Sequence, residues 1–289
     1  MAEQILVTIF GSGDAAAKIE RVRQFFSASA SKPRVMEGCS SFILPSDPRS
    51  DRPRWKEDLL ALEVELHLDI NLQPLREFEI KRRLFVFDMD STLIQAEVID
   101  ELAKLAGVGE QVSAVTASAM RGEIDFKQSF THRISLLRGL PEAKVRDLVA
   151  RIPLTPGVER LFQEFHAHGV RTAIASGGFT FVARELQQRL GINHVHTNEL
   201  HIVDGHVSGA VSGEIVDAAR KAELLRTIAH EEGIPLEQTV AVGDGANDLK
   251  MLAAAGTGIA YHAKPVLREA AKLRISHAPL DAALHLVTL

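Results

Sequence analysis

The sequence predicts an α/β protein with a three-layer, Rossmann-like parallel sheet, an inserted helical cap and a small α+β domain at its N-terminus. Three observations favour this fold class. Short apolar segments alternate with helical segments after residue 84, a long helical stretch interrupts them, and the first 78 residues follow a different pattern. Continuously apolar runs are typical of strands that helices bury on both faces.

The N-terminal pattern predicts a small α+β domain over residues 1–78. The run ILVTIF, the segment GSGD and the periodic AAAKIERVRQFF indicate a strand, a turn and a helix. Further strands are expected at SSFIL and DINLQP, with a proline-rich breaker and an amphipathic helix from Trp55 to about Leu68 between them. Gly11 and Gly13 are interpreted as turn residues and not as a dinucleotide site, because Asp14 would repel a pyrophosphate.

The remaining residues, 79–289, predict the larger domain. Its strands are expected at LFVFD, RTAIAS, HVHTN, TVAVGD and GTGIAY. The helical stretch at about 97–151 is too long for one crossover helix, so we expect it to cap the C-terminal end of the first strand. A hairpin is predicted around Asp204-Gly205. Four nearby histidines are assigned no metal, because exposed strand histidines are far more common than zinc sites: His194, His196, His201 and His206.

Composition limits the function classes. The chain has 289 residues, of which 46% are hydrophobic and 25% charged, as in ordinary globular proteins. A formal net charge of -5 argues against nucleic-acid and anionic-membrane partners. The single cysteine, Cys39, cannot form an internal disulfide, and neither a signal peptide nor a membrane-spanning stretch is recognisable. We therefore expect a cytoplasmic protein.

Acidic residues follow two of the predicted strands. LFVFDMDSTLI places Asp88 and Asp90 on one face at the C-terminal end of a buried strand. One carboxylate of such a pair can attack phosphorus while the other protonates the leaving alcohol and later activates water. VAVGDGANDLKML adds Asp244, with Asn247 and Asp248 at the start of the next helix. A third acid at this edge predicts a Mg²⁺ site.

A phosphate-binding segment is expected beside these acids. TAIASGGF ends a strand in Ser176, Gly177 and Gly178, which offer a hydroxyl and unhindered backbone amides at a predicted helix N-terminus. Lys221 could neutralise the charge that develops on the phosphoryl oxygens.

The segments that carry Asp88, Ser176, Lys221 and Asp244, in this order along the chain, resemble the four motifs of the haloacid-dehalogenase superfamily. The resemblance covers roughly residues 80–289. The resemblance implies that Asp88 is the nucleophile and Asp90 the acid/base, whose backbone carbonyl also binds Mg²⁺. It further implies that Ser176 and Lys221 hold the phosphate. Asp244 would be a metal ligand, with Asp248 behind it.

The cap segments DMDSTLIQAEVIDELAKLAG and MRGEIDFKQSFTHRISLLRGL resemble the phosphoserine phosphatase branch. That resemblance implies that Glu97 binds the substrate ammonium, that Arg133 binds its carboxylate, and that Met120 and Phe126 form an apolar wall. On the residues alone, Met120 and Phe126 would be core residues, and Glu97 and Arg133 a solvated pair. Two further residues are expected at the substrate: Gly178 and Asn247.

The implied reaction is hydrolysis of O-phospho-L-serine to serine and phosphate, the last step of serine biosynthesis. One alternative is phosphoryl transfer to another amino-acid-like alcohol such as homoserine. Another is a catalytically silent regulator that senses an amino acid through its N-terminal domain. That domain resembles a degenerate ACT-type module that lacks one strand. We expect a small-molecule substrate and, as a further hypothesis, a homodimer formed through the small domain.

Overall fold

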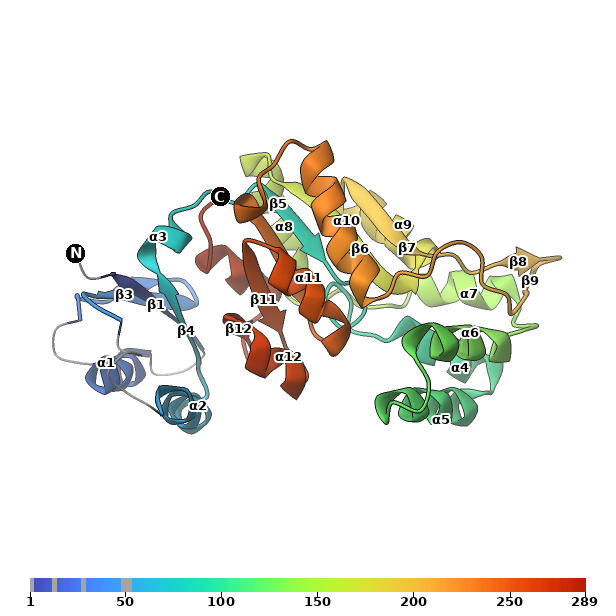
Figure 1. Ribbon diagram of the computed structural model, residues 1–289, viewed down its shortest axis with the longest axis horizontal. Coiled ribbons are helices and arrows are strands. Elements are labelled where there is room, and N and C mark those ends of the chain that lie inside the picture. Colours follow the sequence, from blue (N-terminus) through green and yellow to red (C-terminus); the bar gives the residue numbers. More distant parts are fainter. Residues whose placement is uncertain (1–2, 12–14, 27–29, 48–53) are drawn as a thin grey trace.

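The computed structural model describes residues 3–11, 15–26, 30–47 and 54–289, with an N-terminal sheet, a larger central sheet and a helical insertion beyond it (Figure 1). The predicted turn at 11–14 and the proline-rich breaker at 45–54 lie partly outside the described residues; Gly13 and Asp14 are among those left out. In the part of the chain that is described, no helix combines the length and the apolar character needed to cross a lipid bilayer.

The central sheet has six strands in the order β12-β11-β10-β5-β6-β7, and every neighbouring pair is parallel. The predicted α/β class is therefore confirmed, while the last strand was not predicted. The strands are β5 (Leu84–Phe87), β6 (Arg171–Phe179), β7 (His194–Asn198), β10 (Thr239–Gly243), β11 (Thr257–Tyr261) and β12 (Leu273–Ile275).

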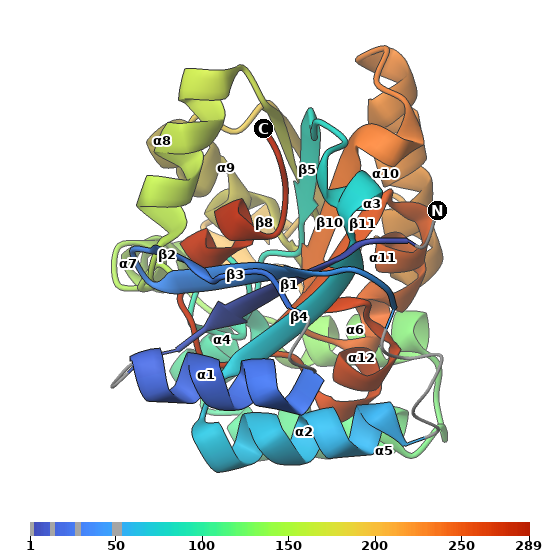
Figure 2. The ribbon, with the colours of Figure 1, turned by 90° about the vertical axis from the view of Figure 1, so that its left-hand side faces the viewer.

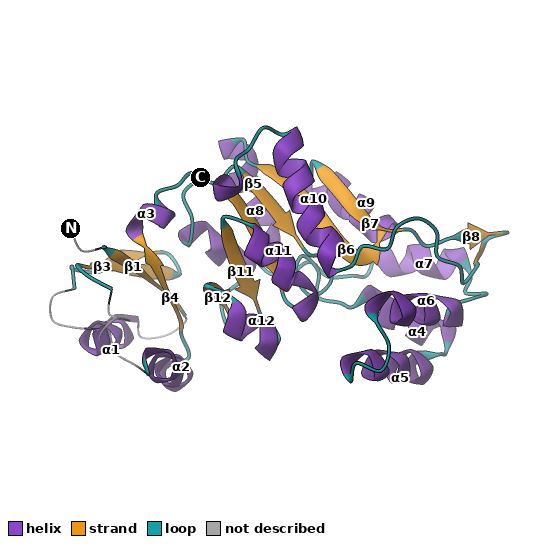
Figure 3. Ribbon diagram, viewed as in Figure 1, coloured by secondary structure: helices purple, strands orange, loops and turns teal. Residues whose placement is uncertain are grey.

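Helices cover both faces of the central sheet (Figure 3), and alternating residues of β5 belong to two different apolar clusters. Phe85 and Phe87 belong to an apolar cluster with helices α8 (Val158–His168) and α9 (Thr180–Leu190). Leu84 and Val86 belong to a second cluster on the opposite face. This burial on both faces explains the continuously apolar strands. The helices of the second layer are α10 (Ala218–Glu231), α11 (Leu249–Ala254) and α12 (Pro265–Ala270).

A helical insertion, helices α4–α7, separates β5 from α8. Gly107, with φ 73°, ends the first of these helices, and the Asp125–Gln128 capping box begins the third. The predicted hairpin is confirmed, because Asp204 and Gly205 both have positive φ in its turn. The elements are α4 (Val98–Ala106), α5 (Gly109–Met120), α6 (Phe126–Leu136), α7 (Glu142–Val149), β8 (Ile202–Val203) and β9 (His206–Val207).

The N-terminal sheet is antiparallel, with the order β2-β3-β1-β4, and helices α1 and α2 lie beside one of its faces (Figure 2). This is a βαββαβ arrangement. The expectation that a strand is missing was wrong: β2 is present but only three residues long. The elements are β1 (Ile5–Phe10), α1 (Ala15–Phe26), β2 (Arg34–Met36), β3 (Cys39–Leu44), α2 (Trp55–Leu66), β4 (Asp69–Pro74) and α3 (Leu75–Phe78).

Strand β4 joins this sheet to the rest of the chain through buried polar side chains at alternate positions. Asn71 donates from Nδ2 to the carbonyl of Arg274 over 2.8 Å and accepts from the Arg274 N–H over 2.7 Å. Gln73 donates to the carbonyl of Leu286 over 3.0 Å. Asp69 accepts from the N–H groups that follow β12. The N-terminal sheet is therefore hydrogen-bonded directly to the edge of the central sheet.

Candidate active site

The candidate site lies where strands β5, β6 and β10 end. In the parallel sheet β5 lies between β6 and β10, so the connections leave it in opposite directions, and ligands bind at such switch points. Asp88 directly follows β5, Asp244 directly follows β10, and Ser176 lies near the end of β6. The topology therefore gathers the predicted side chains at one edge.

Asp88 is held as an ionised carboxylate. Its Oδ1 accepts from the N–H of Met89 over 2.7 Å, and its Oδ2 accepts from Asn247 Nδ2 over 3.1 Å. Burial raises the pKa of Asp88, but the charge and hydrogen bond of Lys221, together with the hydrogen bonds from Ser176 and the Met89 N–H, leave the pKa below its usual value. A buried, charged carboxylate of this kind can act as a nucleophile.

Lys221 supplies the positive charge at the centre of the site. Its Nζ lies 2.7 Å from Asp88 Oδ2 and 2.7 Å from Asp248 Oδ1, and the side chain is only 1% exposed. Burial lowers the pKa of Lys221, yet the two carboxylates raise it above the usual value, so the ammonium stays charged. The residue lies in the first turn of α10, which Asp217 caps by accepting from two backbone N–H groups.

The pKa of Asp90 is shifted in the opposite direction to that of Asp88. Asp90 Oδ2 accepts from the N–H of Val98 over 3.2 Å, whereas Oδ1 is buried and has no hydrogen-bond partner among the described residues. Burial, followed by the charges of Glu97 and Asp88, raises the pKa of Asp90 well above its usual value. The raised pKa favours the protonated form of this carboxyl group, which can donate a proton.

Three buried carboxylates could hold a metal ion. Asp88, Asp244 and Asp248 each offer an oxygen, and these oxygens lie within 4.8 Å of one another. Hard cations such as Mg²⁺ prefer oxygen ligands of this kind. Asp248 is already engaged: its Oδ1 faces Lys221, and its Oδ2 accepts from the N–H groups of Asp244 and Gly245. Its geometry therefore suits a residue that fixes Lys221 and the Asp244 loop.

The predicted phosphate-binding segment has an irregular strand geometry. Strand β6 continues to Phe179 and α9 begins at Thr180, so Ser176 and its two glycines do not form the helix N-terminus that was predicted. The N–H of Gly178 donates to Ser176 Oγ over 3.0 Å. A Cβ at Gly178 would lie 2.5 Å from Met89 Cε and 3.1 Å from Asp90 Oδ1, so no side chain fits there without displacement.

The helical insertion carries the predicted recognition residues. Arg133 on α6 is mostly buried, and its Nε has no hydrogen-bond partner in the described part of the chain. Burial lowers the pKa of Arg133, and the charges of Asp100 and Glu97 oppose that shift. A buried guanidinium with an unused donor is suited to binding an anionic group. Glu97 Oε1 accepts from Ser91 Oγ over 3.0 Å.

The two predicted apolar residues are not in the core. Met120, at the end of α5, is 83% exposed, so the interpretation of Met120 as a core residue was wrong. Phe126 is 37% exposed and stacks on Phe130 with ring centroids 6.1 Å apart. A Cβ on Gly177 would lie 3.1 Å from Phe126 Cζ, so this ring packs directly over the phosphate-binding segment.

Two residues near these groups were missed. Ser91 lies inside the first motif, adopts φ 57° and binds Glu97. Lys264 lies beyond the end of β11, and its Nζ is 3.1 Å from Asp244 Oδ2 and 3.5 Å from Glu97 Oε1. Strand β11 was predicted, and Lys264 follows its C-terminal end. This position could have indicated that Lys264 lies at the same edge of the parallel sheet as the other site residues.

Comparison with known proteins agrees with this geometry. The sequence profile of the haloacid dehalogenase-like hydrolases matches residues 82–256. The chain belongs to this hydrolase family. A solved haloacid-dehalogenase family hydrolase from Salmonella enterica serovar Typhi has a TM-score of 0.90 and 30% identity, and the match covers 98% of each chain.

Its sequence relatives include phosphoserine phosphatases. The one from Archaeoglobus fulgidus is 48% identical over 218 residues, which are 75% of this chain and 63% of that protein. The one from Streptomyces coelicolor is 51% identical over 206 residues, which are 71% of this chain and 50% of that protein. The chain therefore spans about half to two thirds of the length of these relatives.

Proposed function

We propose that the chain is a Mg²⁺-dependent phosphoserine phosphatase that hydrolyses O-phospho-L-serine through an aspartyl-phosphate on Asp88. One observation carries the proposal: Asp88, whose pKa is lowered, and Asp90, whose pKa is raised and whose Oδ1 has no partner among the described residues, are separated by a single residue. Nucleophilic attack and protonation of the leaving group need two carboxyl groups in these different states. Both relatives named above are phosphoserine phosphatases.

The reaction has two steps. A carboxylate oxygen of Asp88 forms a bond to phosphorus while the bond from phosphorus to the serine oxygen breaks, and Asp90 gives its proton to that oxygen. Asp90, now a base, takes a proton from water, which attacks phosphorus and breaks the bond to Asp88. Free phosphate leaves, and both carboxyl groups return to their starting states.

The phosphoryl oxygens would be bound by Lys221, by Ser176 and by the backbone at Gly177 and Gly178. The ammonium of Lys221 is already fixed between two carboxylates, so little reorganisation is needed as charge develops. Asn247, which contacts Asp88, would orient the nucleophile and the bound substrate.

The amino-acid part of the substrate would be recognised by the insertion. The guanidinium of Arg133 matches a carboxylate, and Glu97 matches an ammonium group. Phe126 and the exposed Met120 would cover the substrate when the insertion closes, because exposed apolar side chains at a site gain by excluding water. Together these residues would select a zwitterion that carries a phosphate.

The donor set fits a Mg²⁺ ion. Asp88, Asp244 and the backbone carbonyl of Asp90 would hold it, and when bound it would offset the negative charge that the carboxylates and the phosphate bring together. Asp248 would stay behind these ligands as the partner of Lys221.

The organisation around this site is also proposed. Residues 1–78 would form an ACT-like domain and residues 79–289 the phosphatase domain, with the cap at about 97–151. The separate N-terminal sheet and the helices α4–α7 support this division. A homodimer and a cytoplasmic location stay predictions.

Phosphate release tests the proposed function. O-phospho-L-serine, phosphothreonine, a sugar phosphate and a nucleotide would be compared with Mg²⁺ present, with Asp88→Asn as the control. A strong preference for phosphoserine that the control abolishes is expected. Equal activity across the panel would contradict the substrate assignment. Transfer of the phosphoryl group from phosphoserine to added homoserine, in place of phosphate release, would favour a phosphotransferase.

A further inference from the structure

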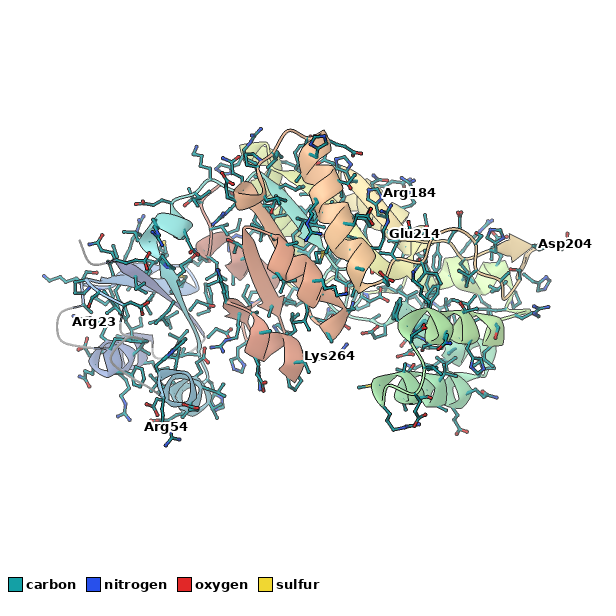
Figure 4. All side chains as sticks on the ribbon, in the orientation of Figure 1. Arg23, Arg54, Arg184, Asp204, Glu214 and Lys264 are labelled. Atoms are coloured by element: carbon teal, nitrogen blue, oxygen red, sulfur yellow. The ribbon has the colours of Figure 1, made fainter. Side chains whose placement is uncertain are left out.

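Lys264 bridges the two halves of the site. Its Nζ lies 3.1 Å from Asp244 Oδ2 on the core and 3.5 Å from Glu97 Oε1 at the start of the insertion. Its backbone N–H also donates to the carbonyl of Asp244 over 2.8 Å, so the residue is fixed at both ends. Figure 4 labels Lys264 on the side of the core that faces the insertion.

Two side chains hold Glu97 at Oε1. Ser91 Oγ donates to this oxygen over 3.0 Å, and Lys264 Nζ lies 3.5 Å from it. A carboxylate held through one oxygen presents the other in a defined direction, which lowers the entropy that binding must remove.

The loop that carries Lys264 is fixed by the segment after β12. His262 adopts φ 42°, donates its N–H to the carbonyl of Ile275 over 2.7 Å, and places Nε2 3.0 Å from the carbonyl of Ala278. A left-handed backbone conformation is unfavourable for residues other than glycine and persists only where the surroundings stabilise it. The two hydrogen bonds of His262 provide that stabilisation.

That segment is in turn held by the N-terminal sheet. The carboxylate of Asp69, at the start of β4, accepts from the N–H groups of Ser276 over 2.8 Å, His277 over 2.8 Å and Ala278 over 3.3 Å. Asp69 is 2% exposed, and charged hydrogen bonds are strong in such surroundings. A continuous set of contacts thus leads from Asp69 through His262 to Lys264.

We propose that Lys264 is a positioning residue that orients Glu97 toward the ammonium group of the substrate, and that Asp69 holds the loop carrying Lys264. The inference rests on the proposed function, because it deepens the role of Glu97. It assigns the N-terminal sheet a part in substrate selection without requiring an effector.

The test compares two substrates that differ only in the ammonium group, O-phospho-L-serine and 3-phosphonooxypropanoate. Lys264→Met should raise KM for phosphoserine about tenfold, within the coupling range of charged residues in direct contact, and change kcat less than threefold. KM for 3-phosphonooxypropanoate should not change. Lys264→Arg should restore most of the selectivity, and Lys250→Met, at an exposed lysine of α11, is the matched control.

Asp69→Asn should give the same selective rise in KM, with the fold checked by circular dichroism and thermal unfolding. Asn71→Ser is its control, because it removes contacts to Arg274 and leaves the bonds to residues 276–278 in place. It should lower stability without changing the preference between the two substrates.

The outcomes separate the two proposals. If the unaltered protein does not hydrolyse phosphoserine, the proposed function fails. If it does and Lys264→Met changes both substrates equally or neither, Lys264 does not position Glu97. If Lys264→Met is selective but Asp69→Asn matches Asn71→Ser, the role of Asp69 is overturned.

Discussion

The Nζ atom of Lys221 lies 2.7 Å from Oδ2 of Asp88, and both side chains are almost completely buried. Asp248 completes the arrangement on the other side of the ammonium group. A single positive charge thus balances two carboxylates in an environment that excludes water. This arrangement keeps Asp88 ionised and fixes the charge that would meet the phosphoryl group.

Lys221→Met should therefore both destabilise and inactivate the protein. It leaves Asp88 and Asp248 buried without their cation, and breaking such a pair costs about 3 to 5 kcal/mol of unfolding free energy. Urea denaturation measures this change. Lys250→Met, at an exposed position, should change stability by less than about 0.5 kcal/mol. An unchanged urea midpoint for Lys221→Met would contradict the account.

The pH dependence of kcat/KM should follow Asp90 on its alkaline side. The first step needs a protonated Asp90, so the rate is lost as pH rises through its raised pKa. Glu97 is among the charges that raise this pKa, so Glu97→Gln should move the alkaline limb to lower pH. Glu110→Gln, at an exposed acid of α5, should leave the limb in place. A shift to higher pH would contradict the assignment.

Gly178→Ala should impair the chemical step. Its Cβ would lie 3.1 Å from Asp90 Oδ1 and would collide with Met89 Cε, so the proton donor would be displaced. Because a displacement of about 1 Å can cost about a hundredfold in rate, we expect the smaller displacement here to lower kcat by up to about tenfold. Gly109→Ala is the matched control, because nothing described lies within 4 Å of a Cβ there. Equal kcat values for the two variants would rule out the close packing as a constraint.

Arg133→Met should weaken recognition of a substrate carboxylate. We expect KM for phosphoserine to rise about tenfold or more, since charged hydrogen bonds contribute about 1.5 to 3 kcal/mol. KM for phosphoethanolamine, which lacks the carboxylate, should not change. Arg146→Met removes an exposed arginine of α7 and is the control. Equal effects on both substrates would show that Arg133 acts only on the fold.

The parts of the fold that follow from local pattern were predictable. Continuously apolar strands indicated the parallel sheet, and acidic residues at the ends of two strands indicated the edge where the site lies. Both features can be recognised within short stretches of consecutive residues. Strands β2 and β12 were missed because each is three residues long and depends on pairing with a neighbour.

The contacts between distant segments could not be predicted. Alternating polar residues such as Asp69, Asn71 and Gln73 usually face solvent in a strand, yet here they are buried against residues about 200 positions later. On the residues alone Met120 would be a core residue, whereas the resemblance placed it at the substrate. Its 83% exposure depends on how the insertion is placed, which the local sequence does not specify. Lys264 was missed because its partners lie far away in the sequence: Asp244 follows β10, and Glu97 precedes helix α4.

The most direct test is to trap the covalent intermediate. The protein would be quenched during turnover of phosphoserine with Mg²⁺ and reduced with deuterated borohydride, which converts an aspartyl phosphate to labelled homoserine. Peptide mass spectrometry would then locate the label. We expect labelled homoserine at position 88 and none in Asp88→Asn. Turnover without a label at position 88, or with one on another residue, would contradict the assignment of Asp88 as nucleophile.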